Sequence, residues 1–179
     1  MTNTPAVPPP FSRIKIRVGA LVFCGAEVAL IRRDRTGSRH YSLPGGNVED
    51  GEDLTVALAR ELAEELALDT AAAEGRDLVW VLDQRVTRPG ATPSPRKLHL
   101  VYRFHVSPAV RATLAERELD ELPDGSHEAG VIEWIDHRRT AALSVYPPVG
   151  PALAALTDPR GTASGVALEA MTDSNYTWV

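Results

Sequence analysis

The chain has 179 residues, a length typical of one domain. Its hydrophobic fraction of 44% and charged fraction of 24% exclude a disordered or fibrous class. The 19 Lys and Arg residues against 24 Asp and Glu residues give a formal charge of -5, which argues against a general nucleic-acid-binding protein. The single cysteine, Cys24, excludes an internal disulfide and favours a reducing compartment.

The sequence predicts neither a membrane span nor an export signal. The longest apolar run, residues 18–26, is far shorter than the ~20 residues that a membrane-spanning helix needs. The first ten residues lack the basic start of a signal peptide, so we expect a cytoplasmic protein. Because residues 1–12 contain consecutive prolines, we expect them to form a flexible N-terminal arm.

The first half of the chain is expected to form strands and then one helix. Alternating apolar residues predict strands at 14–23 and 27–32, and residues 34–40 are polar enough to be a loop. A short strand at 41–43 is expected to stop at a Pro-Gly-Gly sequence. Residues 54–66 lack Gly and Pro and carry a leucine every four residues, which predicts a helix.

The second half is expected to alternate strands with short helices. In chain order, the pattern predicts strands at 78–87 and 97–106, with a mobile loop at 88–95 between them. A short helix or irregular crossing at 110–122 and a strand at 131–135 are expected to follow. Residues 151–156 are expected to lie in a helix that begins near Pro147. This order of elements predicts a layered α/β or α+β domain. The pattern predicts no definite structure for the C-terminal tail, residues 158–179.

The predicted helix at 54–66 carries three glutamates on one side. At 3.6 residues per turn, Glu61, Glu64 and Glu65 fall within a sector of about 100° at the edge of the apolar stripe. Their like charges destabilise the helix, and Arg60 is the only basic residue between positions 46 and 68. A divalent cation such as Mg²⁺ or Mn²⁺ would neutralise them. From the helix alone, the alternative to a metal site is an acidic face that is exposed to solvent.

The stretch from Gly46 to Leu68 resembles the Nudix box, G-x5-E-x7-R-E-U-x-E-E-x-G-U, in which U is an aliphatic residue. Glu52 follows Gly46 after five residues, and after seven more the sequence RELAEELAL begins at Arg60. Every fixed position matches except the last glycine, which is Ala67. Since that glycine ends the helix in the family, we expect a slightly longer helix or a different C-terminal cap here.

The resemblance implies a Nudix-type α/β/α sandwich, with a mixed sheet between helices, over residues 13–157. It also implies a Mg²⁺-dependent enzyme, with Mn²⁺ as a second option. In such an enzyme water attacks a phosphorus of a pyrophosphate in a nucleoside triphosphate, nucleotide sugar or dinucleotide. A Nudix module that binds a nucleotide metabolite without catalysis is the alternative, although the retained glutamates favour the enzyme. An isomerase on the same fold has no supporting residue.

Residue roles follow from the same resemblance. It implies that Glu61 and Glu65 are the main metal ligands and that Glu64 is a further ligand or the general base. The Gly46 carbonyl would complete the metal shell, and Arg60 would orient the glutamates in the catalytic site. Two structural positions complete the motif, namely Glu52, which would brace the loop against the helix, and Gly45, whose missing side chain lets the backbone approach a ligand.

Further candidates lie outside the box. Many family members place a catalytic or metal-binding glutamate near the position of Glu128, expected here in a loop before the strand at 131–135; an exposed loop glutamate is the alternative. We expect a nucleotide-type small molecule as partner, and a homodimer is compatible with the sequence. Candidates for phosphate binding are Arg32, Arg33, Arg35 and Arg39, with a solvated loop as the alternative. Candidates for stacking on a base are Tyr41, Trp80, His99 and Tyr102, with core positions as the alternative. Among these, Arg33, Arg39 and Tyr41 are our choice of substrate-binding residues.

Overall fold

The computed structural model describes residues 13–88, 93–122, 124–162 and 166–177. The expected N-terminal arm at 1–12 lies outside the described residues, as does the middle of the loop expected at 88–95. Within the described ranges, no helix is both long and apolar enough to cross a membrane.

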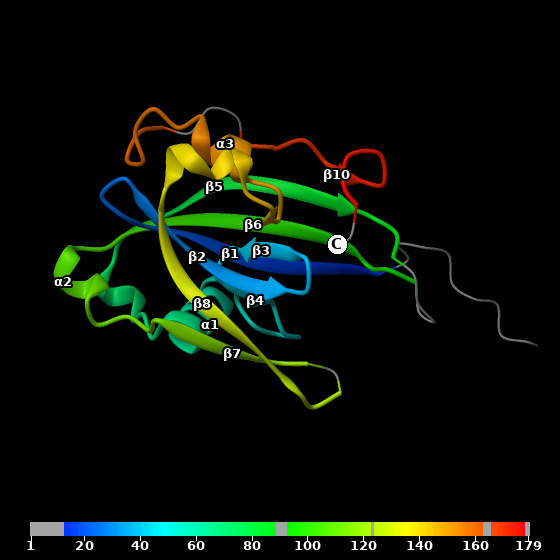
Figure 1. The fold of residues 1–179 in the computed structure, drawn as a ribbon, viewed down its shortest axis with the longest axis horizontal. Coiled ribbons are helices and arrows are strands. Elements are labelled where there is room, and N and C mark those ends of the chain that lie inside the picture. The colour runs from blue at the N-terminus through cyan, green and yellow to red at the C-terminus, as the bar shows by residue number, and fades with distance from the viewer. Residues whose placement is uncertain (1–12, 89–92, 123, 163–165, 178–179) are drawn as a thin grey trace, which may run out of the picture.

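In the described part of the chain, one mixed sheet of ten strands organises the fold (Figure 1). Its strands are β1 (Ile14–Cys24), β2 (Glu27–Arg35), β3 (Ser38–Ser42), β4 (Gly45–Asn47), β5 (Glu74–Arg85), β6 (Arg96–His105), β7 (Arg117–Glu121), β8 (His127–Asp136), β9 (Val145–Tyr146) and β10 (Met171–Thr172). The long first strand, β1, pairs in parallel with β6 and antiparallel with β2 and β4. The strands expected at 14–23, 27–32, 78–87 and 97–106 are therefore present, with shifts at their ends.

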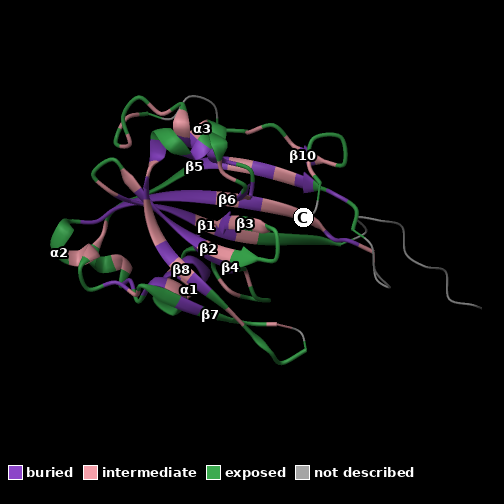
Figure 2. Cartoon of the chain, in the orientation of Figure 1, coloured by how far each residue is buried: buried purple, intermediate pink, exposed green. Residues whose placement is uncertain are grey.

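Helices cover the two faces of this sheet (Figure 2). The helix α1 (Leu54–Leu66) has the predicted bounds and packs its leucines against Val18, Ala20 and Val22 of β1. The opposite face of β1, with Leu21 and Phe23, packs against α3 (Gly150–Ala154), next to the 3-10 helix η2 (His137–Ala142). The short elements α2 (Pro108–Arg111) and η1 (Thr70–Ala72) complete the set. The predicted α+β class, with a mixed sheet between helices, is confirmed.

The prediction of a loop at 34–40 is wrong, because β2 continues to Arg35 and pairs with β3 from Ser38 onward. The two strands form a hairpin closed by a two-residue turn, in which Gly37 adopts a φ of 78°. Backbone hydrogen bonds hold this pairing, so it does not require the apolar alternation on which the prediction relied.

A second difference lies at β7 and β8. The segment expected as a helix or irregular crossing at 110–122 contains the end of α2 and the strand β7, which pairs antiparallel with β8. The strand β8 begins at His127, so Glu128 lies in a strand and not in the loop expected before residue 131. The hairpin partner supplies backbone hydrogen bonds to this polar part of β8, where the side-chain pattern alone predicted no strand.

The helix α1 ends at Leu66, so the longer helix considered for Ala67 is not observed. Ala67 adopts the left-handed conformation, with φ 54° and ψ 29°, and its N–H donates to the carbonyl of Ala63. The N–H of Leu68 donates to the carbonyl of Leu62 at 3.1 Å. These two bonds form the helix end that glycine usually makes, here with an alanine.

Candidate functional site

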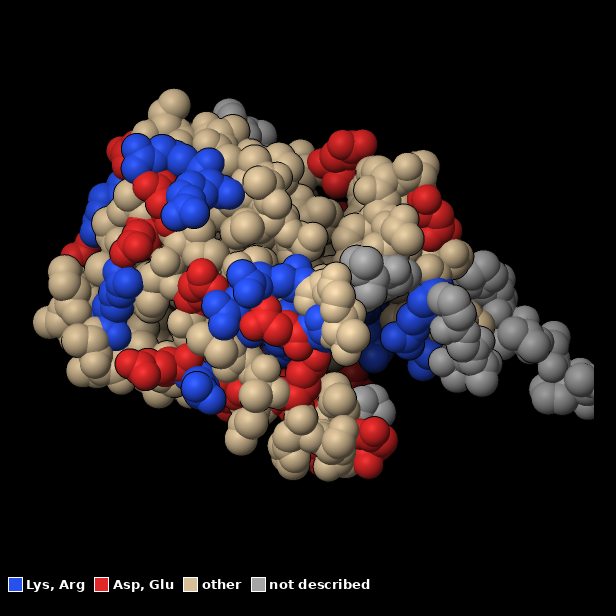
Figure 3. Space-filling model, viewed as in Figure 1, with Lys and Arg blue, Asp and Glu red and all other residues tan. Residues whose placement is uncertain are grey.

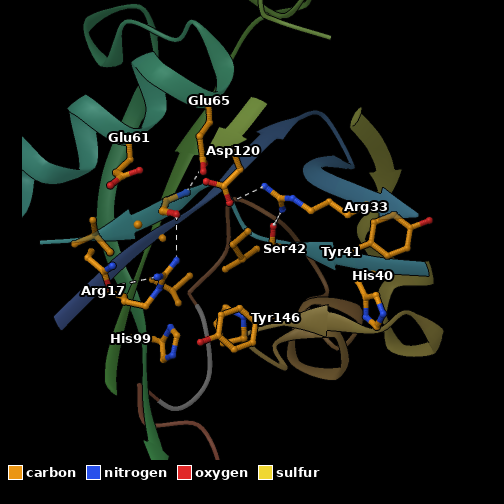
Figure 4. Close-up of a pocket in the computed structure, with 18 of the residues that line it drawn as sticks. Arg17, Arg33, His40, Tyr41, Ser42, Glu61, Glu65, His99, Asp120 and Tyr146 are labelled. Carbon is orange, nitrogen blue, oxygen red and sulfur yellow. Dashed lines mark hydrogen bonds and ion pairs between the residues drawn. The ribbon is translucent and has the colours of Figure 1, made fainter. Parts of the chain in front are cut away.

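A cavity of about 500 Å³ opens where α1 meets the sheet (Figure 4). The helix contributes Glu61 and Glu65, whose carboxylates point toward the backbone of β4. Other lining side chains include Arg17 of β1, Arg33 and Arg35 of β2, His40, Tyr41 and Ser42 of β3, His99 of β6, Asp120 of β7 and Glu128 of β8. The site is thus assembled from segments far apart in the sequence.

The glycine pair of β4 makes room for the helix carboxylates. A Cβ atom on Gly46 would overlap the carboxylate group of Glu61. A Cβ on Gly45 would overlap the carbonyl oxygen of Val18, and its φ of 135° is a conformation that other residues rarely adopt. Only glycine therefore allows β4 to lie against β1 while Glu61 occupies the space beside it.

Glu65 is a partly buried carboxylate with one strong hydrogen bond. Its Oε2 accepts the N–H of Gly45 at 2.7 Å, and no described Lys or Arg forms an ion pair with it. Burial, together with the negative charges of Glu118 and Glu61, raises the pKa of Glu65 to about 8, although the Gly45 N–H and Arg33 act in the opposite direction. A positive charge placed beside Glu65 would favour its ionised form.

Arg60 connects the loop before the helix to the site. Its guanidinium donates to both carboxylate oxygens of Glu52, at 2.9 and 3.0 Å, and to Glu61 at 2.8 Å. It also donates to the carbonyl of Asn47 at 3.2 Å. The Arg60 hydrogen bonds, followed by the N–H of Glu49, hold the pKa of Glu52 below its usual range. This network orients Glu61 and ties the loop to the first turns of α1.

Glu64 takes a different position from the other two helix glutamates. Its side chain is 60% exposed, lies 3.5 Å from Arg60 and does not line the cavity. Accordingly, the part of the chain that the structure describes contains no group of three or more His, Cys, Asp or Glu side chains placed to hold a metal ion. Mg²⁺ often takes only one or two carboxylates together with water and substrate phosphates, so Glu61 and Glu65 remain a fitting pair.

Arg33 lies opposite the helix carboxylates and binds β7 to β2. It forms an ion pair with Glu118 and donates to the hydroxyl of Ser42 at 2.9 Å. Its Nη2 lies 3.7 Å from Asp120, and its Nε lies 3.6 Å from Glu128. Burial raises the pKa of Glu118, against the effect of Arg33. Arg33 therefore neutralises part of an acidic group on the far wall of the cavity.

Glu128 lines the same wall and has its own partner. Arg35 donates to both of its carboxylate oxygens, at 2.9 and 3.1 Å. These hydrogen bonds lower the pKa of Glu128. The carboxylate is therefore ionised at neutral pH and faces the cavity beside Arg33.

The remaining substrate-binding candidates divide into two groups. Tyr41 and His99 line the cavity, whereas Arg39 pairs with Asp34 at 2.8 Å and does not line it. The other candidates outside its lining are Arg32, which pairs with Glu133, and Trp80 and Tyr102, which are buried in the two cores. Basic and acidic side chains also lie next to one another on the face shown in Figure 3.

Several lining residues were not predicted from the sequence. Arg17 is the register partner of His99 in the parallel pair of β1 and β6, and Tyr146 stands beside His99 from β9. Asp120 comes from β7, the strand that the sequence did not predict. Because Arg17 lies on the same face of its strand as Gly19, the sequence could have indicated that Arg17 faces the site. The sequence did not show which strand pairs with β1.

Comparisons with known proteins show the family and the fold of the chain. The family model described as NUDIX domain matches residues 13–154. A Nudix hydrolase from Nitrosomonas europaea superposes with a TM-score of 0.54 at 18% identity, covering 91% of this chain and 81% of that one. The ORF135 protein of E. coli gives a TM-score of 0.52 at 22% identity, over 80% of this chain and 88% of its own. An Ap4A hydrolase of C. elegans gives a TM-score of 0.50 at 17% identity, over 73% of this chain and 85% of its own. A comparison with curated proteins finds no match.

Proposed function

Because the chain belongs to the Nudix family, we propose that it is a metal-dependent hydrolase that cleaves a pyrophosphate bond in a nucleotide-type substrate. The proposed substrate classes are nucleoside triphosphates, nucleotide sugars and dinucleotides. The proposed cofactor is Mg²⁺, which Mn²⁺ could replace, since both prefer oxygen ligands.

The observation that carries the proposal is the pair of helix carboxylates in the cavity. Glu61 and Glu65 lie next to each other at one end of it, and no described cation pairs with Glu65. We propose that these two side chains and the Gly46 carbonyl hold the metal. When bound, such an ion screens the charge of the pyrophosphate and lowers the pKa of a water molecule.

The protein's own residues then have defined tasks. Arg60 holds Glu61 in place, and Glu52 holds Arg60. Arg33, at the opposite wall, offers a guanidinium to substrate phosphates. Positioning and charge neutralisation supply most of the rate enhancement in phosphoryl chemistry, so a rigid arrangement of these groups matters more than a nucleophilic side chain.

Two carboxylates are candidates for the base that takes the proton of the attacking water. Glu128 lines the cavity and is held ionised by Arg35. Glu64 stands outside the lining, next to Arg60. Replacing each by glutamine separates them, because general-base catalysis contributes about 10²–10⁴-fold to a rate and the residue that carries it will show that loss.

The test is a panel of nucleoside triphosphates, sugar nucleotides and dinucleotide polyphosphates, incubated with Mg²⁺ or Mn²⁺ and separated by chromatography. We expect cleavage of at least one substrate at a pyrophosphate bond, and no cleavage with chelator. Tight nucleotide binding without turnover of any member would instead indicate the non-catalytic Nudix module. Hydrolysis that persists in chelator would contradict the metal-dependent mechanism.

A further inference from the structure

The proposed hydrolysis does not use a group of polar side chains at the end of the cavity away from Glu65. We call this group the floor cluster. It consists of Arg17, His99 and Tyr146, which line the cavity, and of Gln84 and Lys97, which form hydrogen bonds with His99 or Tyr146. Arg17 and His99 are direct register partners in the parallel pairing of β1 and β6. The ring of Tyr146 meets the ring of His99 edge-on, at a centroid distance of 5.5 Å and an angle of 83° (Figure 4).

A chain of hydrogen bonds determines which nitrogen of His99 carries its proton. Lys97 donates to the hydroxyl of Tyr146 at 3.2 Å, and that hydroxyl donates to Oε1 of Gln84 at 2.8 Å. The Nε2 of His99 lies 2.7 Å from the same Oε1, which is an acceptor. Nε2 must therefore carry the hydrogen, because two acceptors do not form a hydrogen bond.

The other ring nitrogen, Nδ1, is consequently an acceptor. Burial, together with the charges of Arg17 and Lys97, lowers the pKa of His99 to about 3, so the ring is neutral at physiological pH. His99 lines the cavity, and no described residue donates a hydrogen bond to Nδ1. The lone pair on Nδ1 is therefore left to a ligand.

Arg17 presents the complementary chemistry beside it. Its guanidinium donates to Oδ1 of Asn47 at 3.3 Å and to the carbonyl of Gly45 at 3.4 Å, which are long bonds to neutral acceptors. Within the described residues no carboxylate forms an ion pair with Arg17, in contrast to Arg33 and Arg35. The cavity therefore offers an acceptor and a strong donor next to each other, on neighbouring strands.

We propose that Arg17 and His99 recognise the nucleobase of the substrate. In this arrangement His99 Nδ1 accepts a hydrogen bond from an amino or imino N–H, and Arg17 donates to the adjacent carbonyl or ring nitrogen. A phosphate at neutral pH presents acceptors and offers little to Nδ1, whereas a nucleobase carries a donor beside an acceptor along one edge, at positions that differ from one base to another. The inference rests on the proposed function, since it names which part of a nucleotide lies at the floor cluster.

The test measures binding and does not depend on turnover. Dissociation constants are measured for analogues of four nucleoside triphosphates that differ in their base and carry imido groups in place of both bridging oxygens of the triphosphate, and for inorganic imidotriphosphate with the same two imido bridges, which has no base. For the wild-type protein we expect the best nucleotide to bind at least about tenfold more tightly than both the worst nucleotide and imidotriphosphate, because one good hydrogen-bond pair discriminates by that order.

The decisive variant is His99→Phe, which keeps a planar ring and removes the acceptor. We expect the four nucleotides to bind within about threefold of one another, with imidotriphosphate binding unchanged. The variant His99→Asn retains an acceptor oxygen and should keep most of the discrimination. The matched control is His105→Asn, since His105 lies on the same strand β6, is buried and does not line the cavity.

Two results overturn the proposal: a wild-type protein that binds all four bases equally, or discrimination that survives His99→Phe. If His99→Phe fails to fold, Arg17→Leu provides the same test from the donor side, with the same expected loss. The proposed hydrolase can fail separately, because base-dependent binding without cleavage would refute hydrolysis and leave the recognition pair intact.

Discussion

Among single residues, Gly46 leaves no room for a side chain, because the Glu61 carboxylate occupies the space where a Cβ would stand. We predict that Gly46→Ala displaces this carboxylate and lowers turnover at least about tenfold, as loss of a positioning contact to a metal ligand typically does. The flexible end of Glu61 can move, so the free energy of unfolding should change little. Steady-state kinetics over a range of Mg²⁺ concentrations, together with urea unfolding, measures both quantities.

Two neighbouring glycines supply the controls for this variant. A Cβ on Gly19 would lie 3.6 Å from Leu43, which is ordinary contact, so Gly19→Ala should leave turnover near that of the wild type. Gly45→Ala should instead destabilise the fold, since its Cβ would overlap the backbone of β1. Equal effects of Gly46→Ala and Gly19→Ala on turnover would contradict the role given to Glu61.

Glu65 provides a second prediction at this scale, in which activity and stability change in opposite directions. Glu65→Gln keeps an oxygen that can accept the Gly45 N–H but removes the charge that burial disfavours. We expect turnover to fall by two orders of magnitude or more, while the metal-free protein at pH 8 unfolds at a higher temperature than the wild type. Thermal unfolding without metal and kinetics with Mg²⁺ test both parts. Lower stability of the variant would show that the buried charge is already neutralised.

The arrangement of the site could be predicted only where its residues are close in sequence. The lining residues Arg33, Tyr41 and Glu128 were single candidates with no predicted neighbours. Glu61, Glu65 and the glycines of β4 fall in one stretch, so their spacing was visible. Arg17 and His99 meet because β1 pairs with β6, and the apolar pattern of a strand does not specify its partner. Glu64 was grouped with the other glutamates by its angle on the helix, but its side chain extends to solvent beside Arg60.

At the scale of elements, the end of α1 shows how a sequence departure is accommodated. Ala67 adopts a left-handed conformation that costs a residue with a side chain roughly 1–2 kcal/mol. Ala67→Gly removes this cost. It also raises the conformational entropy of the unfolded chain, which lowers the free energy of unfolding by about 0.4–1 kcal/mol. We therefore predict a free energy of unfolding higher by about 0.5–1 kcal/mol, measured by urea unfolding. An unchanged Kd for Mg²⁺ in the same variant is the control, and weaker metal binding would contradict a purely structural role for this position.

The elements that were predicted well are those with local causes. The helix α1 has the predicted bounds because its leucine spacing and the absence of Gly and Pro are properties of one segment. The hairpin of β2 and β3 and the strand β7 are polar on their exposed positions, and their backbones are held by neighbouring strands. No alternation of side chains signalled β7 or the end of the β2–β3 hairpin at residues 34–40, so the formation of these parts depends on tertiary pairing.

For the whole molecule, the C-terminal segment closes one edge of the sheet. The strand β10 pairs with β5, and Met171 is 1% exposed in a small core with Leu82 and Val86. We predict that Met171→Ala lowers the free energy of unfolding by about 2 kcal/mol, the lower end of the usual cost for such a truncation, since the cluster is small. Val166→Ala is the control, because the Val166 side chain is 58% exposed and should change stability little. Equal effects in denaturant titrations would mean that β10 contributes nothing to the fold.

The parallel pairing of β1 with β6 also has a kinetic consequence. It joins residues about 80 positions apart, and such long-range pairing is among the slow steps of folding because the intervening chain must first be ordered. The helix α1 can form early from its own residues, whereas Arg17 and His99 meet only when β1 pairs with β6. A refolding chain should therefore become helical before it distinguishes one base from another.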